Sequence, residues 1–187
     1  VVVSAASGAV GGAVGQLAKA RGCRAVGIAG GPDKCAYVVN ELGFDACIDY
    51  RAHPDAASLG AALKQACPQG IDGYFENVGG RILDAVMLRM NAFGRIAVCG
   101  MISGYNGEPI PMSHPQLILV SRLKVQGFIV SERMDLWPAA LKELGTMVAT
   151  GRLKYRETVA QGLASAPEAF LGLLKGRNFG KQLVKLV

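Results

Sequence analysis

The chain opens with VVVSAASGAVG, residues 1–11, in which an apolar run leads into a glycine-containing turn. The residues that follow, from Gly11 to Arg21, carry apolar side chains at helical spacing. Where a glycine turn joins a strand to a helix, backbone N–H groups can approach a pyrophosphate at the helix N-terminus. Ala6 replaces the first glycine of the usual Gly-x-Gly-x-x-Gly pattern. The stretch predicts a dinucleotide-binding unit; the alternative is that the glycines only let the helix pack on the strand.

The same alternation of apolar runs and helical patterns continues along the chain. Strands are expected over Val1–Ala5, Arg24–Ala29, Asp45–Asp49, Ile71–Glu76, Gly94–Cys99 and Lys124–Val130. Helices are expected over Gly11–Arg21, Asp33–Leu42, Ala56–Ala66, Arg81–Met90, Gln116–Ser121 and Trp137–Ala149. Because these strands lack polar alternation, they suit a parallel sheet covered on both faces. The sequence predicts an α/β fold with a doubly wound, parallel, six-stranded Rossmann sheet.

The pattern changes at Gly151. A strand over Tyr155–Val159, a helix over Ala166–Leu174 and a final strand over Gln182–Val187 make a unit too small to fold alone. We therefore expect residues 1–150 to form the nucleotide-binding domain. Residues 151–187 are expected to be a C-terminal segment of another domain.

Composition excludes several classes of protein. The 187 residues are 51% hydrophobic, so the chain is not disordered, and polar residues interrupt every apolar stretch before it reaches membrane-spanning length. The net charge of +6 is scattered, which argues against nucleic acid but suits a phosphate-rich small ligand. With five cysteines in no Cys-x-x-Cys pair and only two histidines, we expect no metal site. Reduced thiols favour a cytoplasmic location.

The second strand carries the clue to the coenzyme. A site specific for NAD would have Asp or Glu at the end of this strand to bind the adenine-ribose hydroxyl. The sequence there is Ala29-Gly30-Gly31-Pro32-Asp33-Lys34, with no carboxylate at the strand end and a lysine close by. This favours NADP(H). Asp33 could instead serve as the ribose acid, although its position suggests that it caps the next helix.

Two later strand ends carry polar side chains toward the same edge of the sheet. Asn77 follows the fourth strand and could bind ribose or nicotinamide, or simply form a turn. A Gly/Ser loop after the fifth strand carries Tyr105, which could donate a proton, orient a ribose hydroxyl or only pack.

Together these motifs resemble the zinc-independent medium-chain dehydrogenase/reductases, and more narrowly their NADPH-dependent alkenal/one oxidoreductase branch, which includes prostaglandin and curcumin reductases. The resemblance rests on residues 5–11, 22–24, 33–34, 76–80, 94–96, 99–106 and 173–181. In this family a catalytic domain precedes the first strand, so we expect the chain to be a fragment.

The resemblance implies roles for individual residues. Residues Gly8, Ala9, Val10 and Gly11 would hold the pyrophosphate, Lys34 the 2′-phosphate, Tyr50 the adenosine half and Asn77 the nicotinamide ribose. The cofactor would also be lined by Cys99, Gly100, Met101, Ile102, Ser103, Gly104 and Tyr105, by Phe128, Ile129 and Val130 near the nicotinamide, and by Asn178 from the tail. Tyr105 would be the catalytic residue, holding a ribose hydroxyl or helping to protonate the enolate.

The implied activity is NADPH-dependent reduction of the C=C bond of an α,β-unsaturated aldehyde or ketone, with a small-molecule enone or enal as substrate. A homodimer is expected because the tail would leave apolar surface exposed. A quinone reductase of the same superfamily and a non-catalytic NADP(H)-binding module remain alternatives. A methyltransferase is disfavoured because the second strand lacks an acidic end.

Overall fold

The computed structural model describes all 187 residues, and its centre is one parallel sheet. The strands are β1 (Val2–Ser4), β2 (Val26–Ala29), β3 (Ala46–Asp49), β4 (Ile71–Glu76), β5 (Met90–Val98) and β6 (Lys124–Gly127). Their order across the sheet is β3-β2-β1-β4-β5-β6, and every neighbouring pair is parallel. This is the order of the Rossmann fold, in which the connection changes direction between β1 and β4. The predicted fold class is confirmed.

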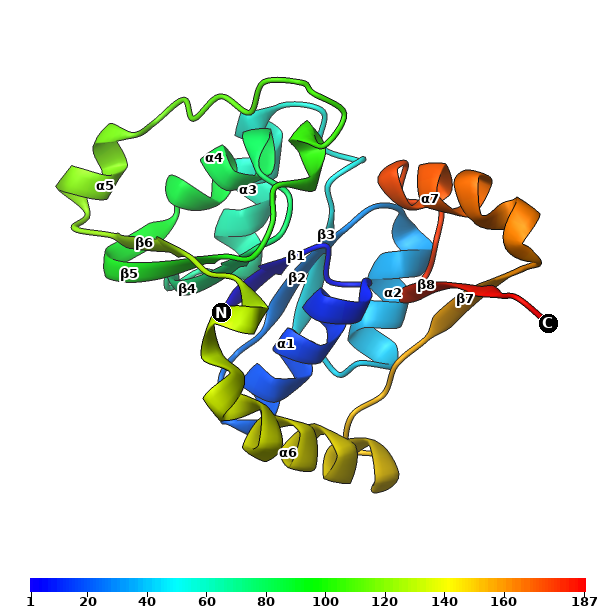
Figure 1. Ribbon diagram of the computed structural model, residues 1–187. Coiled ribbons are helices and arrows are strands. Elements are labelled where there is room, and N and C mark those ends of the chain that lie inside the picture. Colours follow the sequence, from blue (N-terminus) through cyan, green and yellow to red (C-terminus); the bar gives the residue numbers. More distant parts are fainter.

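Helices cover both faces of the sheet (Figure 1). They are α1 (Ala9–Ala20), α2 (Pro32–Asn40), α3 (Ala56–Ala66), α4 (Gly80–Met87), α5 (Gln116–Val120) and α6 (Trp137–Ala149). Helices α3 and α4 pack on one face through a core of 17 buried residues that includes Leu59, Leu63 and Tyr74. A smaller core containing Val38 and Phe44 lies on the opposite face, under α1 and α2. Strands buried on both sides explain the apolar runs of the sequence.

The boundaries differ from the expected ones where turns intervene. The sixth strand ends at Gly127 rather than Val130, and a 3-10 segment, η2 (Val130–Leu136), follows it. The fifth strand begins at Met90 rather than Gly94, because the preceding helix ends at Met87 rather than Met90. Asp33 does not cap α2: Gly31, with a positive φ of 99°, occupies the N-cap without a side-chain hydrogen bond. Pro32 at the first helical position supplies the fixed φ that starts this helix.

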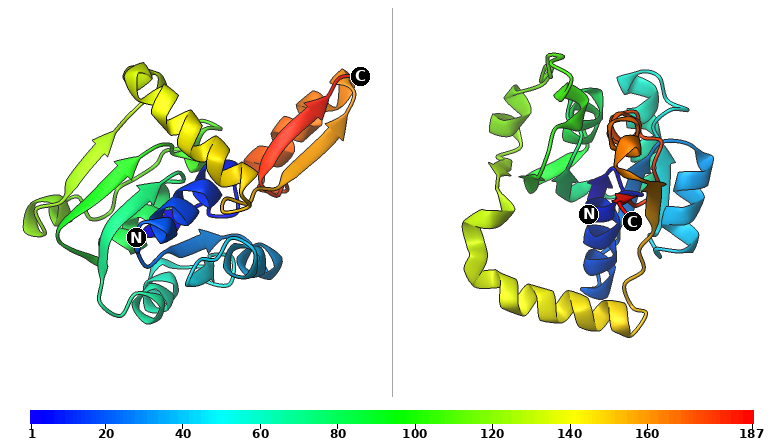
Figure 2. Two further views of the ribbon diagram at one scale, coloured as in Figure 1. Left: turned by 90° about the horizontal axis from the view of Figure 1, so that it is seen from below. Right: turned by 45° about the vertical axis from the view of Figure 1, so that its right-hand side comes forward.

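The last part of the chain forms a separate layer that extends away from the sheet (Figure 2). It contains β7 (Glu157–Gln161), η3 (Leu163–Ser165), α7 (Ala166–Leu174) and β8 (Lys181–Lys185), with β7 and β8 paired in parallel. One further 3-10 turn, η1 (Ile102–Gly104), lies in the loop after β5. We call residues 151–187 the tail.

The tail is fixed to the rest of the chain at the glycine turn. Gly180 forms a bridge with Gly8, and its N–H donates to the Ser7 carbonyl at 3.0 Å. The ring of Phe179 packs edge-to-face on Tyr37 of α2, with centroids 5.8 Å apart. These contacts place the tail beside the N-terminus of α1.

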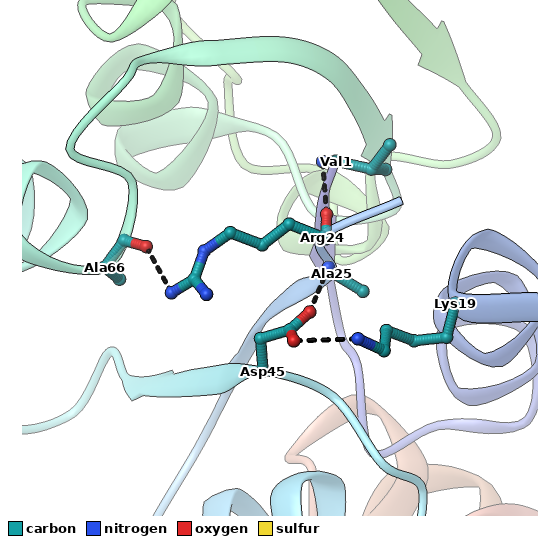
Figure 3. Close-up of polar contacts among 6 residues, drawn as sticks. All are labelled: Val1, Lys19, Arg24, Ala25, Asp45 and Ala66. Carbon is teal, nitrogen blue, oxygen red and sulfur yellow. Dashed lines mark hydrogen bonds and ion pairs between the residues drawn. The ribbon is translucent and has the colours of Figure 1, made fainter. Parts of the chain in front are cut away.

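The opposite edge of the sheet is tied together by Asp45. One carboxylate oxygen accepts the Ala25 N–H at 2.7 Å and the other accepts Lys19 Nζ at 2.7 Å (Figure 3). The hydrogen bond from Lys19 is the main reason that the pKa of this carboxyl lies below its usual value. Arg24 beside it donates to the Ala66 carbonyl at 3.0 Å, at the end of α3. Asp45 and Arg24 thus join the starts of β2 and β3 to helices on both faces.

Gly15 provides a test of the packing between α1 and the chain before β3. A Cβ atom at Gly15 would overlap the ring of Phe44, so Gly15→Ala should lower the free energy of unfolding by about 1–3 kcal/mol. Gly60→Ala in α3 is the matched control, because a Cβ there meets nothing within 4 Å. Alanine is the better helix former, so the control should raise stability by up to about 1 kcal/mol. Urea unfolding of both variants checks this; similar effects would contradict the packing.

Candidate functional site

A cavity of about 600 Å³ lies at the carboxyl ends of β1, β2, β4 and β5, with the tail as its far wall. In doubly wound sheets, ligands bind at this edge, where the strand order reverses. The lining comes from the glycine turn, the ends of β2 and β3, the loops after β4 and β5, and residues 173–182 of the tail. Segments distant in sequence therefore converge on one site.

The glycine turn brings the N-terminus of α1 close to the cavity. Gly8 is the N-cap of α1, and a Cβ at Gly11 would overlap the Ala5 carbonyl oxygen, so only glycine allows this approach. The N–H groups of a first helical turn have no partner within the helix, and α1 has no acidic side chain there. The turn is thus free to bind an anion through main-chain N–H groups.

Ala6 explains why the motif departs from the usual glycine pattern. Its side chain is fully buried in the smaller core, and it lies against the position that a Cβ on Gly27 would take. The residue of the turn with a positive φ is Ala5, at 49°. A methyl group at position 6 therefore fills space beneath the sheet edge and does not enter the cavity.

The charged side chains of the cavity are all positive. Lys34, Arg51, Arg81, Lys175 and Lys181 line it, whereas no Asp or Glu does. Asp33, the residue that could have served as a ribose acid, is outside the lining. Such a lining attracts a ligand with several negative charges.

Lys34 lies where the end of β2 meets the tail. Its Nζ donates to the Gly176 carbonyl at 2.6 Å and is 5.4 Å from the centroid of the Phe179 ring. Burial lowers the pKa of Lys34 below its usual value, and the nearby charge of Arg51 adds to this effect. Lys34 and Arg51 therefore form a close pair of cations at the side of the cavity next to β2 and β3.

Two guanidinium groups lie near the ring of Tyr50. Arg51 and Arg81 are 6.0 and 5.6 Å from the centroid of its ring. Arg81 also donates to the carbonyl oxygens of Tyr50 and His53, which fixes the segment after β3 against the start of α4. A Cβ at Gly30 would lie within 3.1 Å of the Tyr50 ring and hydroxyl, so this glycine leaves room for the aromatic side chain.

The loops after β4 and β5 form the other side of the cavity. Asn77 follows β4, and its Nδ2 donates to the Ser4 carbonyl at 2.8 Å. The Tyr105 hydroxyl lies near Gly100, since a Cβ atom at Gly100 would be 3.1 Å from it, and Tyr105 as a whole is 62% exposed. Ser103 Oγ donates to the Val78 carbonyl at 2.6 Å and joins the two loops.

Most of the residues expected at the site line this cavity. They are Gly8, Ala9, Val10, Gly11, Lys34, Tyr50, Asn77, Cys99, Gly100, Ile102, Ser103, Tyr105 and Asn178. Met101 and Gly104 belong to the same loop but are not lining residues: Met101 packs against the larger core, and Gly104 lies under Ile110.

Residues 128–130 are also outside the lining. Because β6 ends at Gly127, Phe128 turns toward Phe75, with ring centroids 6.0 Å apart, while Ile129 and Val130 are exposed. Their packing against a nicotinamide stays a prediction.

Sequence reasoning did not assign Arg51, Arg81, Lys175 and Lys181. Arg51 directly follows Tyr50, and the two lysines flank Asn178 in the closing stretch, so their proximity to assigned residues was an available signal. Arg81 had none, because it reaches the site only through the placement of α4 beside the 50–53 segment.

The model of the family described as zinc-binding dehydrogenases matches residues 9–151. The chain belongs to this family. It is 49% identical to the tobacco (Nicotiana tabacum) 2-alkenal reductase (NADP(+)-dependent) over 98% of the chain and 53% of that protein. It is 42% identical to the NADPH-dependent curcumin reductase of Escherichia coli over 100% of the chain and 55% of that protein.

A crystal structure of CurA from Vibrio vulnificus in complex with NADPH superimposes with a TM-score of 0.91 at 44% identity, covering 100% of this chain and 56% of that one. The predicted relationship to medium-chain dehydrogenase/reductases of the alkenal reductase branch is confirmed. The chain spans about half the length of these relatives.

The family description refers to zinc, but the residues of this chain do not fit a zinc site. His53 and His114 are its only histidines, and no three side chains of His, Cys, Asp or Glu lie in a group that could hold a metal ion. Separately, none of the helices combines the length and apolar character needed to cross a membrane.

Proposed function

We propose that the cavity binds NADP(H) and that the whole protein reduces the C=C bond of α,β-unsaturated aldehydes or ketones. The observation that carries the proposal is a glycine turn at a helix N-terminus beside a lining with five cations and no carboxylate. The NADP-dependence stated in the names of the two reductases supports it.

The two ends of the coenzyme would lie on either side of the turn. The N–H groups at the start of α1 would hold the pyrophosphate, and Lys34 with Arg51 would pair with the 2′-phosphate near the ends of β2 and β3. Tyr50 would pack by the adenosine, whereas Asn77 and the loop from Cys99 to Tyr105 would face the nicotinamide half. Asn178 would reach the coenzyme from the tail.

When bound, NADPH supplies a hydride to the β-carbon of the conjugated substrate. The protein's own part is to orient the coenzyme, stabilise developing enolate charge and move a proton. The Tyr105 hydroxyl, which lies near Gly100, would donate a hydrogen bond or a proton on the nicotinamide side.

We also propose that residues 151–187 are part of a catalytic domain present in the whole protein. The tail leaves Leu163, Phe170 and Leu171 more than half exposed, as expected for a surface that another domain covers. Five free thiols support a cytoplasmic location.

Lys34→Ala tests the coenzyme preference. Loss of a charge-assisted contact to a phosphate should weaken NADPH binding about 10- to 100-fold, with a much smaller effect on NADH. Lys34 also bonds the Gly176 carbonyl, so the ratio of the two affinities, measured by nicotinamide fluorescence, is the decisive quantity. Lys64→Ala, an exposed lysine of α3 outside the cavity, is the control. Equal losses for the two coenzymes would refute the role of Lys34.

Tyr105→Phe tests the catalytic role. In the whole protein, removal of the hydroxyl should reduce kcat with an enal about 10-fold or more, because a positioned proton donor contributes on that scale or above. The affinity for NADPH should change little, since the ring remains. Tyr155→Phe, an exposed tyrosine outside the cavity, is the control. An unchanged kcat would leave Tyr105 with a packing role only.

We propose that the protein forms a homodimer. Strand β6 is an open sheet edge, and the side chains of Phe93, Leu119 and Val120 near it are 68%, 79% and 62% exposed. Sedimentation velocity over a range of concentrations should show a dimer. A single monomeric species at all concentrations would exclude it.

A further inference from the structure

Beneath the cavity, Ser4 and Glu76 form a buried hydrogen-bonded pair. Ser4 ends β1 and Glu76 ends β4, the two neighbouring strands at which the sheet order reverses, and neither residue has any exposed surface. Ser4 Oγ donates to Glu76 Oε1 at 2.9 Å, and the same oxygen accepts the Val78 N–H. The carboxyl thus connects one strand end to the loop that follows the other.

Asn77 is held by the same pair at two points. Its backbone N–H donates to Ser4 Oγ at 2.8 Å, and its side-chain Nδ2 donates to the Ser4 carbonyl oxygen at 2.8 Å. One of the two Nδ2 hydrogens is thus used by the Ser4 carbonyl, and the side chain, which lines the cavity, retains Oδ1 as an acceptor and the second N–H as a donor. The direction of this amide follows from Ser4, since a backbone carbonyl accepts from the amide nitrogen and never from its oxygen.

A buried carboxyl is a costly way to hold two strands together. Glu76 Oε2 and the nearby Tyr74 hydroxyl are buried and make no hydrogen bond, and apolar side chains of similar size would avoid that cost. Burial and the Glu76 carboxylate raise the pKa of Tyr74 well above its usual value, so its hydroxyl stays a neutral neighbour. An apolar pair, however, would provide neither an acceptor for the Val78 N–H nor a fixed Ser4 hydroxyl to accept the Asn77 N–H.

We propose that Ser4 and Glu76 are positioning residues that fix the orientation of the Asn77 amide at the cavity wall, so that its Oδ1 accepts a hydrogen bond from the bound ligand. This proposal rests on the proposed function: in NADPH the donor is a hydroxyl of the nicotinamide-side ribose or an N–H of the carboxamide.

A double-mutant cycle separates this role from a general structural one. Ser4→Ala and Asn77→Ala should each weaken NADPH binding about 5- to 10-fold, the value of one hydrogen bond. The double variant should lose no more than Asn77→Ala alone, because Ser4 acts through Asn77. The probe 2′,5′-ADP, which has no nicotinamide half, should bind all three variants as it binds the unsubstituted protein.

Glu76→Gln is the conservative variant and Glu76→Ala its partner. Glutamine keeps an oxygen that accepts from Ser4 and Val78, and its new N–H₂ can donate to Tyr74, so Glu76→Gln should bind NADPH normally. Glu76→Ala should lose affinity for NADPH but not for 2′,5′-ADP. Thermal unfolding identifies any variant that does not fold. If Glu76→Ala does not fold, the NADPH affinities of Ser4→Ala and Glu76→Gln test the positioning role in its place.

The outcomes are distinct. Additive losses in the cycle, or equal losses of NADPH and 2′,5′-ADP by folded variants, would overturn the positioning role while leaving NADP(H) binding intact. Failure of the unsubstituted protein to bind NADPH would overturn the proposed function, and the inference with it.

Discussion

The close approach of α1 to the turn after β1 is the constraint on which the site depends. Gly11 lies so near the Ala5 carbonyl that any side chain would force the helix away. If α1 moved outward, its N-terminal N–H groups would leave the cavity, and Gly8 would lose its bridge to Gly180 in the tail. The contact between Gly11 and the Ala5 carbonyl thus sets the positions of the helix, the cavity and the tail together.

The charges of the cavity are organised around this turn without help from acidic partners. Two of its cations are held by backbone carbonyls and an aromatic ring: Lys34 by Gly176 and Phe179, and Arg81 by the carbonyls of Tyr50 and His53. Carbonyl groups orient a cation while leaving its charge uncompensated, in contrast to an ion pair such as that of Lys19 with Asp45. The site therefore keeps its positive potential, whereas the opposite edge of the sheet uses its charges for cohesion.

The sequence predicted most of the fold because the deciding signals are local. Apolar runs between helical patterns give the strands, and their burial on both faces gives the parallel sheet. The sequence-based prediction was wrong where a turn overrides a run of aromatic and β-branched residues, as at Phe128 to Val130. Their apolar character suits a strand, although the pairing with β5 ends at Gly127. Likewise Asp33 follows Pro32 and comes too late in α2 to cap it.

For the site too, the sequence predicted some residues and missed others. The glycine turn, Lys34, Asn77 and Tyr105 lie at strand ends, where the rule for doubly wound sheets places ligands, and sequence position alone was sufficient. Arg81 and the Ser4–Glu76 pair depend on which strands and helices become neighbours, and a pair 72 residues apart leaves no local trace. Contacts made by tertiary packing were therefore the part that sequence reasoning missed.

The Gln16 side chain shows how the tail is connected at its other end. Its amide donates to the Lys154 carbonyl and accepts the Lys154 N–H, so a helix side chain pairs with the backbone as a neighbouring strand would. Together with the junction at Gly180 and the contacts of Lys34 and Tyr37 with the tail, this attaches the tail to both α1 and α2. The tail therefore cannot turn away from the sheet without breaking these contacts and opening the far wall of the cavity.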